Sequence, residues 1–147
     1  MFMHKLQGLS KAERLSSRKA IERLFAEGKS LKAYPIRLLY LPLTEAEARA
    51  SVLPSSSKLA DETPRFQVLF SVPKRLVRKA VHRNRIKRQL REAFRLNKAN
   101  YASELKNYYL IALIYMSREQ QPFAQTQDKL KEAFLRLLST DTSTNSA

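Results

Sequence analysis

The sequence predicts an α/β sandwich, in which a small mixed sheet is covered by three helices. Strand-length and helical apolar patterns alternate along the chain in the order helix, strand, strand, helix, strand, helix. The chain has 147 residues, of which 44% are hydrophobic, enough to build the core of one domain. We therefore expect a single domain over residues 1–147, with frayed tails at residues 1–10 and 139–147.

The first predicted helix begins after Ser16 and Ser17, either of which can act as its N-cap. Gly28 is placed to end this helix in a left-handed conformation. One face of the helix collects apolar residues, namely Ala20, Ile21, Leu24 and Phe25. Branched and aromatic residues over 35–41 then predict a strand that Pro42 closes.

The segment 44–64 is polar and contains a run of three serines, so we expect a long loop with one helical turn around residues 45–49. A strand follows over residues 66–72, ended by Pro73. Alternate positions of this strand are apolar: Phe66, Val68, Phe70 and Val72. Leu69 interrupts the polar side, so we expect both faces of the strand to be covered.

The remaining elements are two helices and the strand between them. Residues 108–115 form a nearly continuous apolar run, which is typical of a strand buried on both faces. The helix before it carries apolar residues at helical spacing, at Ile86, Leu90, Ala93 and Phe94. The last helix has a similar stripe, made of Leu130, Ala133, Phe134, Leu137 and Leu138.

The charge of the chain is strongly positive and concentrated. The chain has 28 lysine and arginine residues against 13 aspartate and glutamate residues, a formal net charge of +15. Residues 74–95 hold ten of these basic residues and a single acid, Glu92. Nucleic acid is the usual partner of so basic a domain. A membrane surface is the competing polyanion, but it would require a basic amphipathic segment with a clean apolar face, and the local concentration of charge favours nucleic acid.

Other functional classes are excluded by composition. The absence of cysteine rules out disulfides, thiolate zinc sites and a cysteine nucleophile. No apolar run reaches the ~20 residues that span a bilayer. The first residues lack the apolar core of a secretion signal, so we expect a cytoplasmic protein.

The basic helix carries a second stripe beside its apolar one. Asn84, Arg88, Arg91 and Arg95 repeat at helical spacing about a third of a turn away, with Lys87 on the edge. Arg85 and Glu92 are expected to point elsewhere. A guanidinium can grip phosphate with two hydrogen bonds and can stack on bases. An ordinary solvated helix face is the alternative, but such faces mix signs, and here only Arg88 and Glu92 offer an i,i+4 pair.

The segment from Phe70 to Arg95 resembles the signature of the bacterial ribonuclease P protein subunit, whose hallmark is the stretch Arg83, Asn84 and Arg85. The resemblance spans most of residues 14–138 and includes the Arg14–Leu15 pair. It implies an α/β sandwich with a left-handed crossover between parallel strands around the basic helix. It also implies a protein that assists a catalytic RNA in removing 5′ leaders from precursor tRNA.

The resemblance implies the following partners and site residues. The partners are the catalytic ribonuclease P RNA and precursor tRNA, with Mg²⁺ held mainly by the RNA, no small-molecule substrate, no membrane, and a monomer without RNA. The residues facing the RNA subunit are Lys74, Arg75, Arg83, Arg85, Lys87, Arg88, Arg91 and Arg95. A cleft for the single-stranded leader is lined by Phe25, Leu38, Tyr40, Ser71 and Asn84. Without the resemblance, Phe25 and Tyr40 are better interpreted as core residues.

The chain departs from the family pattern at several positions. Ile21 stands where the family usually has Phe, which removes one stacking ring, and Pro73 replaces a small polar residue. Val77 replaces a Gly, so the backbone there must manage without a glycine conformation. Tyr115 and Met116 replace the family's Ala-Arg pair, and the loop over residues 44–64 is longer than usual.

Two other functions compete with this interpretation. One is a non-catalytic ribosomal or RNA-assembly protein that uses the same basic helix. The other is a metal-dependent nuclease that acts alone. His82 has no obvious carboxylate partner, and the acids Asp61 and Glu62 are neighbours in a loop. The other acids are too scattered to suggest a two-metal site, so we expect no catalytic residues in the protein.

Overall fold

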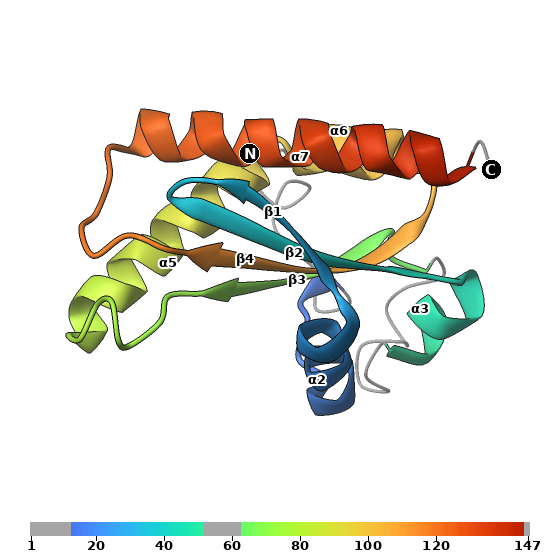
Figure 1. The fold of residues 1–147 in the computed structure, drawn as a ribbon, viewed down its shortest axis with the longest axis horizontal. Coiled ribbons are helices and arrows are strands. Elements are labelled where there is room, and N and C mark those ends of the chain that lie inside the picture. Colours follow the sequence, from blue (N-terminus) through green and yellow to red (C-terminus); the bar gives the residue numbers. More distant parts are fainter. Residues whose placement is uncertain (1–12, 52–62, 146–147) are drawn as a thin grey trace, which may run out of the picture.

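The fold is an α/β sandwich, as the sequence predicts. The computed structural model describes residues 13–51 and 63–145. The elements in this part are α2 (Arg18–Glu27), β1 (Lys29–Ala33), β2 (Ile36–Leu43), α3 (Glu45–Ser51), β3 (Phe66–Ser71), α5 (Ala80–Arg95), α6 (Lys98–Glu104), β4 (Tyr108–Tyr115) and α7 (Phe123–Asn145). A four-stranded sheet in the order β1-β2-β4-β3 separates α5, α6 and α7 from α2 and α3 (Figure 1). The described part holds five helices where the sequence predicts three.

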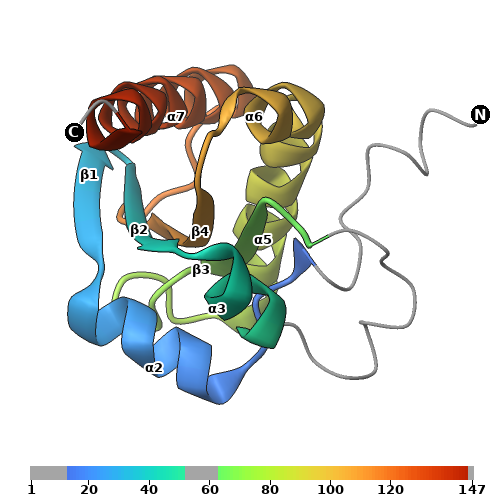
Figure 2. The same ribbon diagram turned by 90° about the vertical axis from the view of Figure 1, so that its right-hand side faces the viewer.

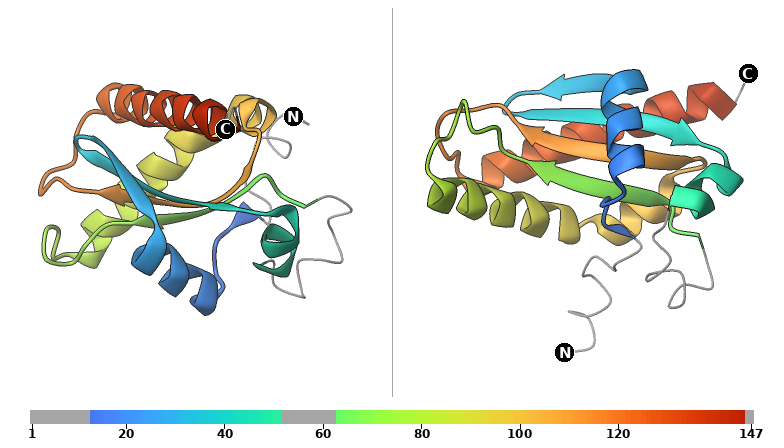
Figure 3. Two further views of the ribbon diagram at one scale, coloured as in Figure 1. Left: turned by 45° about the vertical axis from the view of Figure 1, so that its right-hand side comes forward. Right: turned by 90° about the horizontal axis from the view of Figure 1, so that it is seen from below.

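The sheet is mixed, and its one parallel pair makes the unusual crossover. β2 runs antiparallel to both β1 and β4, whereas β3 runs parallel to β4. The chain passes from β3 to β4 through α5 and α6, which pack on the same face as α7. In the right-hand view of Figure 3, the arrows of β3 and β4 both point left, and β3 lies below β4. The face of the sheet that α5, α6 and α7 cover is turned away from the viewer. The chain therefore leaves β3, passes behind the sheet and returns in β4, and this connection is a left-handed crossover (Figures 2 and 3). It is an exception to the rule that crossovers between parallel strands are right-handed.

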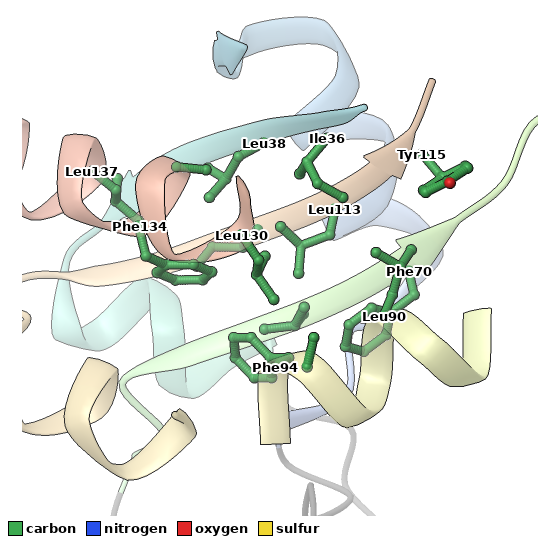
Figure 4. Packing of buried hydrophobic residues seen from close by; sticks show 14 of the residues in the cluster. Ile36, Leu38, Phe70, Leu90, Phe94, Leu113, Tyr115, Leu130, Phe134 and Leu137 are labelled. Atoms are coloured by element: carbon green, nitrogen blue, oxygen red, sulfur yellow. The ribbon is translucent and has the colours of Figure 1, made fainter. Parts of the chain in front are cut away.

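The two faces of the sheet bury two separate apolar clusters. On the α5/α7 face, Phe94 packs edge to face on Phe66 at a ring-centroid distance of 5.4 Å and lies 5.5 Å from Phe134. Figure 4 shows Phe94 and Phe134 between the sheet and the two helices. On the other face, a smaller cluster joins the sheet to Leu24 of α2 and Ala48 of α3. Both faces of β4 are covered, as predicted, whereas β3 is covered except at the half-buried Leu69 and Ser71.

The end of α2 differs from the prediction in its backbone conformation. Ser17 is the N-cap, and its side chain accepts a hydrogen bond from the backbone N–H of Ala20 at 3.3 Å. Gly28 is extended, with φ −68° and ψ 156°, because β1 begins at the next residue. The predicted left-handed conformation is therefore wrong. Glycine is needed here because a Cβ would lie 2.4 Å from the carbonyl oxygen of Leu24.

The first strand was not predicted and the second is longer than predicted. β2 continues through Pro42 to Leu43 and is not closed by the proline. Its pairing with β1 ends at Tyr40, so Pro42 lies where β4 is the neighbouring strand and a second ladder donor is not required. β1 lies at the sheet edge and most of its residues are exposed, which leaves a weak apolar pattern in the sequence.

Within the predicted loop over residues 44–64, the helical turn is confirmed and is longer than expected. It is α3, which begins with a reciprocal cap. The Thr44 hydroxyl accepts from the backbone N–H of Glu47 at 3.1 Å, and the Glu47 carboxylate accepts from the backbone N–H of Thr44 at 3.0 Å. The rest of that loop up to residue 62, and the predicted tail at residues 1–10, lie outside the described residues.

The C-terminal segment is part of a helix, so the prediction of a frayed tail from residue 139 is wrong. α7 runs to Asn145, and Asp141 is only 1% exposed. Its carboxylate accepts hydrogen bonds from the backbone N–H of Lys106 at 2.7 Å and from the Tyr109 hydroxyl at 2.7 Å. It also accepts from the backbone and side-chain N–H groups of Asn107. These bonds tie the end of α7 to the start of β4.

Candidate nucleic-acid interface

The buried apolar side of α5 fixes the direction in which its basic side chains point. Ile86, Leu90 and Ala93 are buried against the sheet. Arg88 and Arg91 lie on other faces of the helix and are exposed. The predicted separation of an apolar stripe from an arginine stripe is therefore confirmed.

Three arginines of α5 and Lys87 meet at one cavity of about 560 Å³, here called the basic groove. Its lining residues are Arg14, Leu15, Val68, Leu69, Phe70, Lys87, Arg88, Arg91, Glu92 and Arg95. Arg14 arrives from the segment before α2, which pairs with β3 through a hydrogen bond from the backbone N–H of Leu15 to the Val68 carbonyl at 3.0 Å. The groove thus has apolar lining from β3 and basic side chains from two distant segments. Sequence reasoning did not identify Arg14 as a site residue.

The charges of the groove are largely uncompensated. Among the described residues, no carboxylate lies within ion-pair distance of Lys87, Arg88 or Arg91. The Arg91 guanidinium lies 5.9 Å from the centre of the Phe70 ring, where a cation is attracted to the ring face. Such a surface attracts anions, and its mixture of cations with an apolar lining suits a phosphate-bearing aromatic ligand.

Glu92 is the exception in the groove. Its carboxylate accepts a hydrogen bond from Arg95 Nε at 3.0 Å and a second from another nitrogen of the same guanidinium. This hydrogen bonding raises the pKa of Arg95. Glu92 pairs with Arg95, and the prediction that Glu92 points away from the arginine stripe is wrong.

The start of α5 extends the positive surface beyond the groove. Lys74 and Arg75, in the turn before the helix, and Arg85 are exposed and do not line the groove. The helix has no side-chain cap and no acid in its first turn, so cations crowd the positive end of its dipole. This arrangement is unfavourable when the N-terminus of α5 has no anion beside it and becomes favourable when an anion binds there.

Arg83 has a structural role in addition to its charge. Its guanidinium donates to the carbonyl of Val77 at 3.1 Å and to the carbonyl of Arg78 at 2.6 Å. The residue is half-buried. Arg83 therefore holds the loop that precedes α5 against the helix.

The five residues predicted to line a leader cleft are not brought together. Leu38 and Tyr40 are 0% and 5% exposed and belong to the core cluster on the α5/α7 face, where Figure 4 shows Leu38. Because strand side chains alternate, it is Leu39 that faces the α2 side. The predicted placement of Leu38 and Tyr40 on an accessible surface is therefore wrong. Phe25 (51% exposed), Asn84 (exposed) and Ser71 (half-buried) remain accessible.

The sequence profile of the family described as Ribonuclease P matches residues 9–138 of the chain. The chain belongs to the ribonuclease P protein family. It is 35% identical over 133 residues to the ribonuclease P protein component of Porphyromonas gingivalis, which covers 88% of this chain and 86% of that protein. It is 34% identical over 119 residues to the ribonuclease P protein component of Chlorobaculum tepidum, covering 75% of this chain and 68% of that protein.

Solved structures of ribonuclease P proteins share the fold. The protein from Thermotoga maritima aligns with a TM-score of 0.59 at 24% identity, covering 84% of this chain and 96% of that chain. The protein from Staphylococcus aureus aligns with a TM-score of 0.59 at 21% identity, covering 85% of this chain and 94% of that chain. At these identities the likeness establishes the architecture.

The departures from the ribonuclease P family pattern are accommodated by packing. Val77 is 6% exposed and packs in the core of the α5/α7 face. No non-glycine residue in the described ranges has a positive φ, so the backbone at Val77 needs no glycine. Ile21 is half-buried against the smaller cluster, where it acts as a packing residue.

The described residues do not assemble a protein-borne metal site. No three histidine, aspartate or glutamate side chains within residues 13–51 and 63–145 are grouped to hold an ion. In the same ranges, no helix is both long enough and apolar enough to cross a bilayer.

Proposed function

We propose that this chain is the protein subunit of ribonuclease P and that its basic groove, with the start of α5, binds the RNA subunit. The observation that carries the proposal is the set of uncompensated cations Lys87, Arg88 and Arg91 on a helix whose other side is locked in the core. Cations that lack acidic partners on a preformed helix attract a polyanion without a large ordering penalty.

Binding in the groove rests on phosphate neutralisation. Lys87, Arg88 and Arg91 would each contact RNA phosphates and release counterions, while Arg14 would close the opposite wall. Phe70 and Leu69 provide an apolar floor on which a ribose or an unstacked base can pack. Lys74, Arg75 and Arg85 would extend the contact along the RNA beyond the groove.

A 5′ leader would lie on the accessible residues of the predicted cleft. We keep Phe25, Ser71 and Asn84 as leader-contacting residues and omit Leu38 and Tyr40, because both are buried. Phe25 is the strongest of the three, since an exposed ring offers a stacking surface to an unpaired base. The protein would then hold substrate and RNA subunit together, while the catalytic RNA and its Mg²⁺ cleave the precursor tRNA.

Reconstitution tests this function. Precursor tRNA with Mg²⁺ is incubated with the protein alone, with the cognate ribonuclease P RNA alone, and with both. We expect no cleavage by the protein alone and faster release of the leader when the protein joins the RNA at low Mg²⁺. Cleavage by the protein alone would favour the independent nuclease, and no stimulation of the RNA would favour the ribosomal or assembly protein.

A further inference from the structure

The segment before α2, residues 13–15, is here called the strap because it pairs with the outer edge of β3. Arg14 forms a parallel bridge with Val68, and the backbone N–H of Leu15 donates to the Val68 carbonyl at 3.0 Å. The Leu15 side chain is 4% exposed and belongs to the cluster on the α2 side of the sheet. The strap is therefore fixed on the side of Arg14 that leads to α2.

An ion pair fixes the strap on the other side of Arg14. Lys98 Nζ lies 2.7 Å from Glu13 Oε1, and the two side chains are only 12% and 16% exposed. Lys98 is the first residue of α6, and 85 positions separate it from Glu13. Such a buried pair contributes little net stability, because the cost of removing both charges from water offsets their attraction. What the pair does determine is the position of the strap relative to α6.

The helix α6 gives Lys98 a rigid base. One turn after Lys98, Tyr101 is 7% exposed, and its ring stacks on that of Phe134 at a centroid distance of 4.1 Å. The backbone N–H of Tyr101 donates to the carbonyl of Asn97, the N-cap residue of α6, at 3.1 Å. The Lys98 end of the ion pair is thus anchored to the same core that holds α5.

Arg14 itself remains available to a ligand. It is exposed, and among residues 13–51 and 63–145 no carboxylate lies within ion-pair distance of its guanidinium. Its side chain lines the basic groove together with Arg88 and Arg91, and Figure 2 shows the segment before α2 beside α5. Glu13 does not line the groove, because its carboxylate is bound to Lys98. The strap therefore presents a cation to the groove and keeps the neighbouring acid out of it.

We propose that Glu13 and Lys98 are positioning residues for RNA binding, which hold Arg14 at the wall of the basic groove. An arginine whose backbone is already fixed loses less conformational entropy when it contacts a phosphate. The inference rests on the proposed function, because it takes the ribonuclease P RNA as the ligand of the groove. It adds that an ion pair outside the groove controls the contact made by a residue inside it.

The variant Glu13→Gln separates positioning from simple electrostatics, since the two predict opposite signs. It raises the net charge by one, so long-range attraction alone would tighten RNA binding. We expect weaker binding instead, by about two- to tenfold, because Arg14 must then be ordered by the RNA. Filter binding of the full chain to the ribonuclease P RNA measures the change. Affinity equal to that of the wild type, or higher, would overturn the proposal.

A matched control and an exchange of charges accompany this variant. Glu22 pairs with Arg18 at 3.7 Å on the exposed surface of α2, so Glu22→Gln makes the same change of charge without altering the strap. Its RNA affinity should be no lower than that of the wild type. The double variant Glu13→Lys with Lys98→Glu restores an ion pair at unchanged net charge and should recover most of the lost affinity. Equal weakening in Glu22→Gln, or no recovery in a folded exchange variant, would contradict the proposal.

A double-mutant cycle tests whether the pair acts through Arg14. Arg14→Ala alone should weaken RNA binding and reduce the slope of log affinity against log salt by about 0.7–0.9. Adding Glu13→Gln to Arg14→Ala should cause no further loss, because the residue that the pair positions is already absent. Additive losses would mean that Glu13 acts by another route and would refute the positioning role.

Hydrogen exchange of the free protein gives a readout that needs no RNA. The amide of Leu15, which donates to the Val68 carbonyl, should lose protection in Glu13→Gln. The amide of Tyr109, which donates to the Arg65 carbonyl, should keep its protection. Equal loss at both amides would assign the ion pair to global stability and overturn the proposal.

The wild-type protein separates this inference from the proposed function. No saturable binding of the ribonuclease P RNA by the wild type would overturn both. Saturable wild-type binding with unchanged affinity in Glu13→Gln would overturn the positioning role alone. RNA binding without stimulation of cleavage would refute the proposed function, while the affinity of Glu13→Gln would still decide how Arg14 is held.

Discussion

The helices α5 and α7 pack side by side on one face of the sheet and bury similar stripes, yet their outer surfaces differ. Both bury a phenylalanine at the centre of the same core, Phe94 and Phe134, whose centroids are 5.5 Å apart. α7 mixes signs on its outer side, where Lys129 pairs with Glu132 at 3.5 Å. α5 carries a run of cations opposed by a single acid, Glu92.

This difference separates what folding requires from what it does not. Folding requires the apolar stripe, and both helices have it. Nothing in the core requires the outer charges of α5 to share one sign, and the resulting self-repulsion opposes folding. The comparison therefore assigns the inner sides of both helices to stability and leaves the outer side of α5 for the proposed contact with RNA.

The largest expected effect tests the shared core. Phe94→Ala and Phe134→Ala should each lower the free energy of unfolding by about 3–5 kcal/mol, because each leaves a cavity among packed rings. Urea unfolding followed by far-ultraviolet circular dichroism measures the loss. Leu135→Ala, at an exposed position of α7, is the control and should change stability by less than about 0.5 kcal/mol. A much smaller loss in the free energy of unfolding for Phe134→Ala than for Phe94→Ala would show that α7 is not equivalent to α5 in the core.

The next effect concerns the end of α7. Asp141→Ala should cost about 2–3 kcal/mol, since it removes a buried carboxylate and leaves several buried donors unsatisfied. Asp141→Asn retains an acceptor oxygen and should lose less. The same urea experiment distinguishes the two variants. An Asp141→Ala protein as stable as the wild type would restore the prediction of a frayed tail.

What the sequence predicted correctly about the fold came from periodic apolar patterns. β4 and the inner stripe of α5 were predicted because a long period constrains the position of every residue in it. β1, α6 and the last turns of α7 were missed because tertiary contacts create them. Asp141 shows why: it stabilises the end of α7 through hydrogen bonds from donors more than thirty residues away, at Lys106 and Tyr109.

The candidate site was predictable only where one helix carries it. Lys87, Arg88 and Arg91 could be placed together because they share a helix with a clear apolar stripe. Arg14 could not, because it reaches the groove through a bridge to Val68 on a distant strand. Leu38 and Tyr40 were assigned to the wrong side of β2, since a shift of one residue along a strand changes the face on which a side chain lies.

The third effect tests the outer side of α5 directly. Arg88→Ala and Arg91→Ala should leave the free energy of unfolding within about 0.5 kcal/mol of wild type, because both side chains are exposed and unpaired among the described residues. Each should reduce the slope of log affinity against log salt for the ribonuclease P RNA by about 0.7–0.9. Filter binding over a range of salt concentrations measures this slope.

Lys131→Ala on α7 is the matched control for that experiment, because it removes an exposed charge from the other helix. Its salt slope should equal that of the wild type. An unchanged slope in both arginine variants would move the RNA contact away from the basic groove, and an equal reduction in Lys131→Ala would erase the distinction between the helices.

The smallest effect comes from the one acid of the basic groove. Glu92→Gln removes a negative charge from the proposed RNA-binding groove and releases the Arg95 guanidinium from its carboxylate. Because the pair is partly exposed, the electrostatic gain is modest, and RNA affinity should rise about two- to fivefold. Glu132→Gln on α7, which loses an exposed partner of Lys129, should leave affinity unchanged. Weaker RNA binding by Glu92→Gln would mean that Glu92 orients Arg95 for binding, so that the one acid of α5 also contributes to RNA affinity.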